Sequence, residues 1–348
     1  MPDRKPPPLA LAFALVMFTL LAAASVQPAA AHDGASSPDG ARQEFWLPAV
    51  FVDYQNLVVD PKDRESSRDF YRSVYLASED VPHAWNGDYE SCDPGDTSRQ
   101  YKAAVRLRVN YFRAMAGVPA DISLSPELNR MAQAAALIMG RNGDLSHFPP
   151  DTWQCYSADG ATAAGNSNLS MGRSGPGAVM GQMADEGDNN AAVGHRRWIL
   201  CPQSRTFGTG DVPGTPDYRF RPANALWVID GRRHYNDPRP ATRDEFVAWP
   251  PPGYVPGPVV FPRWSFSYDD ADFTEATVRM TANGADIAVR LEPLAYNRCE
   301  NTLVWIPDID FAALDLAQDR SFKVSVRDVW MDGMKRSFDY TVTVFDPE

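Results

Sequence analysis

The spacing of apolar residues changes near residue 200, and this change limits the folds that the chain can adopt. Between residues 98 and 200, apolar side chains recur every three or four positions, which is the spacing of amphipathic helices. After Leu200, short runs rich in β-branched and aromatic residues alternate with Gly, Pro, Asn and Asp, a pattern typical of strands and turns. We therefore expect an α+β fold in which a mixed helical part precedes a small all-β part.

Two helices in the first part have clear ends. One is expected over residues 98–117. The next has Ser125 as its N-cap and Pro126 at its first helical position, and Gly140 and Gly143 are expected to end it. Its apolar stripe comprises Leu128, Met131, Ala132, Ala135, Ile138 and Met139.

Weaker patterns complete the secondary structure. They predict short helices at 69–76 and 176–184, and strands at 206–211, 225–230, 276–281, 286–291, 322–326 and 338–342. The pair Asn283-Gly284 is a strong signal for a hairpin turn between two of these strands. Short strands joined by such turns indicate a β-sandwich-like domain.

The chain divides into five expected segments. These are a signal peptide over residues 1–31, an irregular segment over 32–97 that packs on the next domain, a mixed domain over 98–245, a Pro/Gly-rich linker over 246–262, and a β-sandwich-like domain over 263–348. Arg4 and Lys5, an apolar run over 9–24 and small residues near Ala31 indicate the signal peptide and its cleavage site. Because that run is shorter than the roughly 20 residues of a spanning helix, we expect export and a mature chain without a transmembrane anchor.

The negative net charge of the chain argues against one class of partner, the nucleic acids. The formal net charge of −12 repels the phosphate backbone of nucleic acids, so nucleic-acid binding is disfavoured. Arg196 and Arg197 are interpreted as structural residues that pair with the nearby carboxylates of Asp185, Glu186 and Asp188. We expect a monomer that is extracellular or lies in the cell envelope.

Four cysteines in an exported chain predict two disulfides, for which three pairings are possible. No pair has the short Cys-x-x-Cys spacing that a cysteine zinc site requires. We favour Cys92–Cys155, which would tie the N-terminal segment to the helical layer, and Cys201–Cys299, which would clamp the strand-rich domain to the domain before it. The alternative is that the second pair stays reduced.

Four stretches between residues 98 and 232 resemble motifs of one known family. They are Arg108-Val109-Asn110-Tyr111-Phe112-Arg113, Leu124-Ser125-Pro126-Glu127-Leu128, Gly165-Asn166-Ser167-Asn168-Leu169 and Gly194-His195-Arg196-Arg197-Trp198-Ile199-Leu200. In their order and spacing they resemble the CAP superfamily (cysteine-rich secretory proteins, antigen 5 and pathogenesis-related 1 proteins), also called SCP-like domains, in a bacterial secreted form. The resemblance implies that residues 98–245 form an α-β-α sandwich. It also implies a solvent-facing cavity lined by two histidines and two acidic residues, where some members bind a divalent metal.

The resemblance assigns His147 and His195 to the two histidine positions. Ser167 occupies the first acidic position, and the second corresponds to either Asp185 or Glu186. With one carboxylate missing, zinc or another divalent metal at the two histidines is one alternative, and rings that only hydrogen-bond neighbouring backbone are the other. Apart from zinc or another divalent metal in the first alternative, no cofactor is expected.

The serine residues near the histidines do not complete a known catalytic motif. Ser146 and His147 are adjacent on an extended chain and would point to opposite faces, so Ser167 is the better nucleophile candidate. The chain contains no Gly-x-Ser-x-Gly nucleophile elbow. No residue is therefore assigned as catalytic.

Two functions are compatible with these residues. The leading interpretation is a non-catalytic binding or interaction module whose ligand is a small apolar molecule, a glycan or an extracellular protein. The competing hypothesis is a secreted metal-assisted or serine-type hydrolase that uses His147 and His195. A third alternative is that the C-terminal domain, and not the cavity, does the binding.

Overall fold

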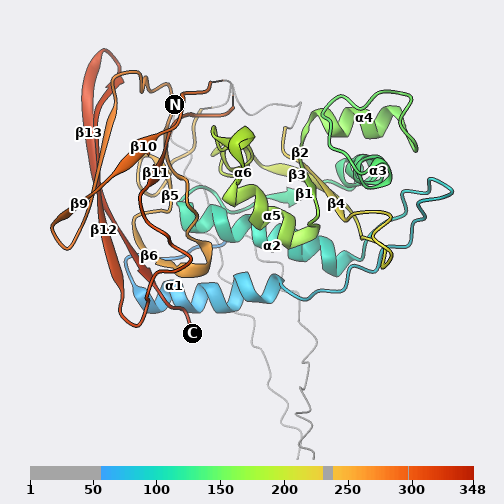
Figure 1. Cartoon of the computed structure of the whole chain (residues 1–348), viewed down its shortest axis with the longest axis horizontal. Coiled ribbons are helices and arrows are strands. Elements are labelled where there is room, and N and C mark those ends of the chain that lie inside the picture. The colour runs from blue at the N-terminus through green and yellow to red at the C-terminus, as the bar shows by residue number, and fades with distance from the viewer. Residues whose placement is uncertain (1–55, 230–237, 297) are drawn as a thin grey trace, which may run out of the picture. The chain divides into compact units, whose positions relative to one another are not determined.

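Helices and sheets both contribute to the structure, a computed structural model that describes residues 56–229, 238–296 and 298–348 (Figure 1). The mixture is α+β, as the sequence predicts. The signal peptide expected at residues 1–31 lies outside these ranges. Within them, no helix is both long and apolar enough to cross a membrane.

The helices lie mainly in the first half of the chain. They are α1 (Arg64–Phe70), α2 (Arg99–Ala116), α3 (Pro126–Asn142), α4 (Ala158–Gly165), α5 (Gly175–Ala184) and α6 (Gly194–Ile199), with short helical turns of other types at Tyr71–Tyr75, Leu76–Ser78, Asp188–Asn190 and Gly257–Val259. In α3 the Ser125 hydroxyl accepts a hydrogen bond from the Leu128 backbone N–H (3.4 Å), and Gly143 takes the left-handed C-cap conformation (φ 67°). Gly140 does not end this helix. It lies inside α3, where a Cβ would come within 2.8 Å of the Tyr89 hydroxyl oxygen.

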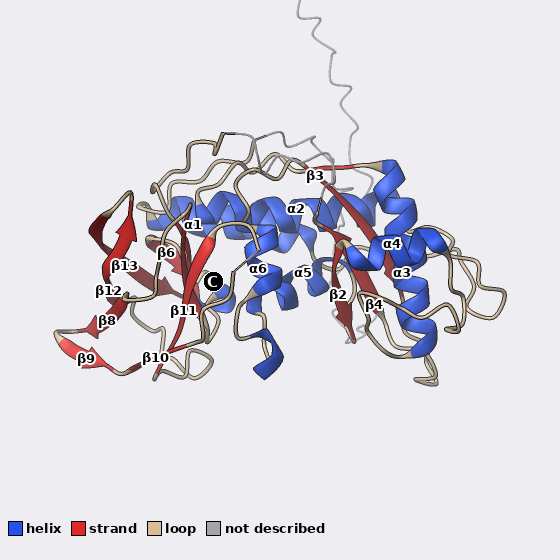
Figure 2. Cartoon of the chain, turned by 90° about the horizontal axis from the view of Figure 1, so that it is seen from above, coloured by secondary structure: helices blue, strands red, loops and turns tan. Residues whose placement is uncertain are grey.

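The first sheet lies between two helical layers (Figure 2). Its strands are β1 (Ser123–Leu124), β2 (Ser167–Met171), β3 (Thr206–Val212) and β4 (Ala223–Trp227), in the order β1-β3-β4-β2. The pair β1–β3 is parallel and the other pairs are antiparallel. Helix α3 packs on β3 and β4, while α5 contacts β2 and β4 and is itself covered by α2.

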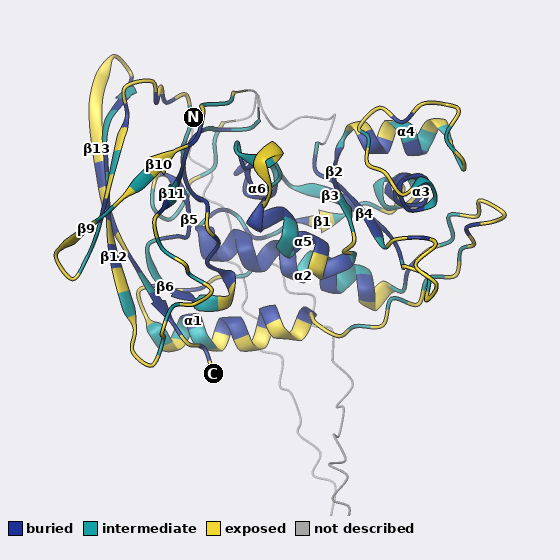
Figure 3. Ribbon diagram, viewed as in Figure 1, coloured by how far each residue is buried: buried dark blue, intermediate teal, exposed yellow. Residues whose placement is uncertain are grey.

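Alternation along β4 gives this sheet two buried faces. Ala223, Ala225 and Trp227 belong to the apolar cluster that includes the α3 side chains. Leu226 belongs to the larger cluster that contains the buried side chains of α2 and α5. Because successive side chains of a strand point to opposite faces, one five-residue strand supplies both cores. Figure 3 shows this strand as buried along its length.

Two further sheets form the C-terminal part. One consists of β5 (Val247–Trp249), β7 (Trp264–Tyr268), β10 (Val289–Leu291) and β11 (Asn301–Pro307), in the order β10-β11-β7-β5. The other consists of β6 (Gly253–Pro256), β8 (Thr277–Ala282), β9 (Ala285–Ile287), β12 (Arg320–Met331) and β13 (Met334–Phe345), in the order β6-β13-β12-β8-β9. The strand expected over 286–291 is divided, since β9 and β10 belong to different sheets. Aromatic pairs join the two sheets, including Phe266–Phe338 (centroids 5.0 Å apart) and Trp264–Phe322 (6.1 Å).

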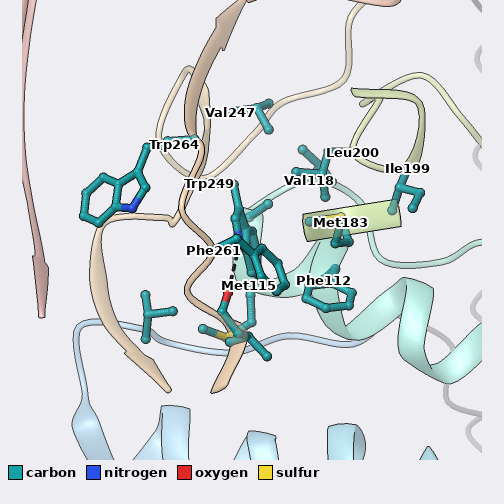
Figure 4. Close-up of a cluster of buried hydrophobic side chains, with 14 of the residues drawn as sticks. Phe112, Met115, Val118, Met183, Ile199, Leu200, Val247, Trp249, Phe261 and Trp264 are labelled. Carbon is teal, nitrogen blue, oxygen red and sulfur yellow. Dashed lines mark hydrogen bonds between the residues drawn. The ribbon is translucent and has the colours of Figure 1, made fainter. Parts of the chain in front are cut away.

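The segment expected to be a linker, residues 246–262, contributes a strand to each C-terminal sheet. Trp249, the last residue of β5, is fully buried, and its ring centroid lies 5.1 Å from that of Phe112 in α2 (Figure 4). Phe261 also contacts Phe112, at 6.4 Å. The helical part and the C-terminal part therefore share one apolar core. The domain boundaries drawn from the sequence stay a prediction.

Both disulfides are present in the pairing that the sequence analysis favours. Cys92 is bonded to Cys155 and Cys201 to Cys299. The first joins the N-terminal segment to the loop that follows α3. The second joins the residue after α6 and Leu200 to the loop before β11, so it connects the helical part to the C-terminal sheets.

Candidate functional site

A cleft of about 1090 Å³ contains both predicted histidines. His147, Ser167, Glu186 and His195 all line it, whereas Asp185 is buried beside His195. The lining is rich in amide and hydroxyl side chains, namely Ser146, Ser167, Asn168, Ser170, Gln182, Asn189 and Asn190, with Phe148, Met171, Trp198, Ile229 and Tyr296 among its larger apolar and aromatic groups. The fold therefore brings together residues from five sequence regions that the motifs alone left apart.

His195 is held by a buried carboxylate. Asp185 follows α5 in the left-handed conformation (φ 53°), and its Oδ1 lies 2.6 Å from His195 Nδ1. The other oxygen, Oδ2, accepts the backbone N–H of His195 at 3.0 Å. An ionised carboxylate can only accept, so the neutral imidazole carries its proton on Nδ1 and keeps a lone pair on Nε2. This fixes the orientation of a ring that lines the cleft.

A residue of the C-terminal part contacts the backbone of Asp185. The Arg263 guanidinium donates to the backbone carbonyl of Asp185 at 2.7 Å, and both residues are buried. Left-handed backbone is uncommon for a non-glycine residue and persists where surrounding contacts enforce it. The Arg263 contact is one such constraint on Asp185, and no sequence motif indicates it.

His147 is held by backbone and not by a carboxylate. Its Nδ1 lies 2.9 Å from the carbonyl oxygen of Ala164, near the end of α4. The ring is thereby oriented with Nδ1 as donor and Nε2 as the remaining ring nitrogen. The two predicted histidines thus line one cleft, one fixed by Asp185 and the other by a main-chain carbonyl.

Ser167 lines the cleft without a hydrogen bond to either histidine. The residue is 5% exposed, and its hydroxyl oxygen has no hydrogen-bond partner within residues 56–229, 238–296 and 298–348. The next residue, Asn168, donates to the His195 carbonyl at 3.0 Å. A Ser167–His195 nucleophile–base pair is therefore absent from the described part of the chain.

A buried polar network lies behind the cleft wall. Gln182 of α5 donates to Asn224 of β4 at 2.9 Å, and Asn224 donates to Asp211 of β3 at 2.9 Å. Asp211 also accepts the Gly175 backbone N–H at 2.5 Å, and burial raises the pKa of its carboxyl. Every link is a hydrogen bond between different elements, so the network fixes α5 on the sheet. It was not predicted, because its members are far apart in the sequence.

Arg196 and Arg197 are structural, but not through the carboxylate pairs that we expected. Arg196 donates to the backbone carbonyls of Met183 (2.7 Å) and Arg263 (2.8 Å). Arg197 donates to the carbonyls of Ala295 (2.7 Å) and Glu300 (2.8 Å). Both side chains point into the protein, where burial lowers the pKa of each guanidinium to about 10. The partners of both guanidinium groups are therefore backbone carbonyls and not the expected carboxylates. Through these hydrogen bonds the two arginines join α6 to the C-terminal part.

His147 and His195 are the histidines among the residues that line the cleft. In the parts of the chain that the structure describes, no group of three His, Cys, Asp or Glu side chains is arranged to hold a metal ion. Glu186 lines the same cleft but is not part of such a group. Two histidines alone make a weak zinc site. We therefore derive no chemical step through a metal.

One protein-family model matches the part of the chain that contains the two histidines. Residues 107–230 match the model of the CAP family, described as the cysteine-rich secretory protein family. This segment is a CAP domain. The match covers β2 with Ser167, α6 with His195, and the loop between α3 and α4 that contains His147, as the sequence resemblance implied.

Other comparisons add little. No curated protein matches the chain. One solved structure that matches is titled "Crystal Structure of PcoC, a Methionine Rich Copper Resistance Protein from Escherichia coli". It is 17% identical, covers 28% of this chain and 92% of that chain, and has a TM-score of 0.22. A TM-score this low carries no argument about fold or function.

The cleft extends beyond the CAP domain. Tyr296 and Arg298 of the C-terminal part line it, although they lie well outside the matched segment. Sequence reasoning did not select either residue. The available signal was Cys299, because the expected Cys201–Cys299 bond places its neighbours beside α6.

Proposed function

We propose that the protein is an exported, non-catalytic binding module whose site is the cleft around His147 and His195. Support comes from the size and lining of the cleft. Pockets for small molecules occupy about 300–1,000 Å³, and this open cleft of about 1090 Å³ is slightly larger than that range. Its amide and hydroxyl groups suit a ligand rich in hydroxyls better than an apolar one. An extended glycan is the occupant that this surface favours.

The two histidines provide fixed acceptors for such a ligand. Each ring is oriented through Nδ1, by Asp185 or by the Ala164 carbonyl. A lone pair on Nε2 can then accept a ligand hydroxyl without reorganisation of the ring. Preorganisation of this kind reduces the entropy cost of binding. Export is supported by the two disulfides, because disulfides persist in oxidising compartments.

Binding calorimetry with neutral and acidic oligosaccharides, a fatty acid and a short peptide tests this proposal. We expect an oligosaccharide to bind, and we expect His195→Ala and His147→Ala to weaken its affinity about tenfold, which corresponds to one lost hydrogen bond. Turnover of a peptide, ester or glycan that disappears in either variant would refute the non-catalytic assignment.

A hydrolase remains the second candidate, favoured by one observation. The Asp185–His195 contact of 2.6 Å resembles the orienting half of a general-base arrangement, and metal-binding histidines are also commonly held through their second ring nitrogen. The metal-assisted version predicts stoichiometric zinc in the purified protein and a rise in Tm on zinc addition, since a ligand that binds only the folded state stabilises it. Both effects should vanish in His147→Ala. A protein without zinc, whose Tm does not respond to zinc, would exclude this version.

A further inference from the structure

The loop that leads into β11 is fixed against the CAP domain at several points. The Arg197 guanidinium donates to the carbonyls of Ala295 and Glu300, on both sides of the loop. Cys299, between these positions, is bonded to Cys201. These contacts hold Tyr296 and Arg298 at the cleft, so this wall is built by the C-terminal part and not by the CAP domain.

Arg298 lies directly against the start of α6. A Cβ built on Gly194 would meet Arg298 Cδ and Nε at 3.0 Å, so only a glycine allows this approach without displacing the side chain. Gly194 immediately precedes His195, and all three residues line the cleft. The Arg298 guanidinium therefore lies in the same cleft as the oriented His195 ring, against the backbone next to it.

The charge of Arg298 is not balanced within the described residues. No hydrogen bond or ion pair of Arg298 occurs in residues 56–229, 238–296 and 298–348, and its charge contributes to lowering the pKa of Arg197, after burial. Arg173 also lines the cleft, folded over Gly181, and its only polar contact within those residues is a distant one with Met180 Sδ (3.9 Å). Glu186 is the exposed carboxylate on the lining. Two arginines of an acidic protein therefore line this cleft without a carboxylate partner among residues 56–229, 238–296 and 298–348, an arrangement that attracts anions.

We propose that Arg298 recognises a carboxylate of the ligand, and that the cleft selects an acidic oligosaccharide over a neutral one. This inference rests on the proposed function as a binding cleft. A guanidinium binds a carboxylate with two parallel hydrogen bonds, which a lysine cannot reproduce. The amide and hydroxyl side chains of the lining can form hydrogen bonds with the sugar hydroxyls. Tyr296, which is 46% exposed, can stack on a sugar ring.

A matched pair of probes tests the charge requirement. Calorimetry would compare a galacturonic acid tetrasaccharide with its methyl ester, which has the same sugar skeleton without the carboxylate charges. We expect the full-length protein to bind the free acid about tenfold or more tightly than the ester, which is the effect of a charge-assisted hydrogen bond. Arg298→Ala should remove this preference, and Arg298→Lys should restore only part of it.

Two further variants make the test specific. Gly194→Ala should displace the flexible Arg298 side chain without removing it, and should reduce the preference for the acid. Arg279→Ala is the control, because Arg279 is an exposed arginine of β8 that pairs with Asp286 and does not line the cleft. It should bind as the unmodified protein does.

The possible failures are distinguishable. Equal affinity for acid and ester, or an Arg298→Ala variant that keeps the preference, would overturn the role of Arg298 and leave the binding cleft in place. Failure of every oligosaccharide to bind would overturn both this inference and the glycan-binding function. The circular dichroism spectrum and Tm of each variant show whether a loss of binding reflects unfolding.

Discussion

At the residue scale, Asp185 connects the site to the rest of the protein. Its carboxylate accepts hydrogen bonds from the His195 ring and from the backbone N–H groups of His195 and Arg196. Its carbonyl accepts from Arg263. It also lies close enough to the buried Arg196 to favour the charged guanidinium. The position and the charge of the Asp185 side chain are therefore expected to affect both ligand binding in the cleft and the stability of the fold.

Asp185→Asn should lower the free energy of unfolding by about 1.5–3 kcal/mol, the usual worth of hydrogen bonds to a charged group. The amide removes one acceptor and the negative charge near Arg196. Urea denaturation measures the change, with Asp188→Asn as control, because Asp188 is exposed in the turn Asp188–Asn190. Equal stability of the two variants would mean that the Asp185 contacts contribute little.

His83 should make the stability of the protein depend on pH. Its ring packs on Tyr101 (centroids 4.5 Å apart), both ring nitrogens lack hydrogen-bond partners in the described residues, and burial lowers its pKa to about 4. The unfolded chain, with an ordinary histidine pKa of about 6.5, then binds a proton that the folded protein does not. This contribution to stability is complete above pH 6.5 and is lost as the pH falls towards 4.

Replacement by phenylalanine tests this sign. His83→Phe keeps an aromatic ring and removes the titrating group, so its free energy of unfolding should fall less than that of the unmodified protein between pH 6.5 and 4. Urea denaturation at several pH values gives both curves. Parallel curves would show that His83 does not titrate differently on unfolding.

At the scale of elements, the packing of β3 on α3 depends on glycine. A Cβ on Gly210 would lie 2.1 Å from backbone atoms of Ala132 and Gln133, and one on Gly208 would lie 2.5 Å from Leu128 Cβ. The strand and the helix backbone therefore approach more closely than any side chain allows. Gln133 adds hydrogen bonds to the backbone of Asp211 on the same strand.

Gly210→Ala should cost about 1–3 kcal/mol or more, because the clash is with backbone that cannot rotate away. Gly177→Ala is the matched control: Gly177 lies in α5, a Cβ there meets nothing within 4 Å, and alanine favours helix, so its stability should rise by up to about 1 kcal/mol. Thermal denaturation compares the two. Similar Tm values for both variants would contradict the close contact.

Elements with strong local signals were predictable. Ser125, Pro126 and Gly143 bound α3 as expected, because capping chemistry acts within one turn. The two short helices α4 and α6 were not predicted, since they contain too few residues to show a period. One strand is predicted at 286–291, whereas the structure has two short strands there that belong to different sheets, because alternation along a chain does not reveal which strand lies beside it.

At the scale of the whole molecule, the CAP domain and the C-terminal sheets share a core. Trp249 and Phe261 pack with Phe112, and Arg196 donates to the Arg263 carbonyl and to the Ser265 hydroxyl (3.1 Å). Separation of the two parts would expose this apolar surface and leave a buried guanidinium without its acceptors. Neither part is expected to unfold before the other.

Calorimetry should therefore show a single thermal transition in which the calorimetric and van 't Hoff enthalpies agree. A second measurement is tryptophan fluorescence, since tryptophans lie in both parts, Trp198 and Trp227 in the CAP domain and Trp249 and Trp264 in the C-terminal part. It should give the same Tm as circular dichroism, which follows the helices. Two separated transitions would show that the parts are independent domains.

The sequence by itself determined the α+β class, the caps of α3 and the hairpin turn at Asn283-Gly284, and it limited the four cysteines to three possible pairings. These features depend on neighbours within a few residues or on the small number of cysteines. Only the tertiary structure decided which groups hold the two histidines, which carbonyls bind Arg196 and Arg197, and that Arg298 lies in the cleft. Such contacts join residues up to about a hundred positions apart, as between Arg197 and Glu300. Local periodicity carries no information about them, because they arise only when separate elements pack together.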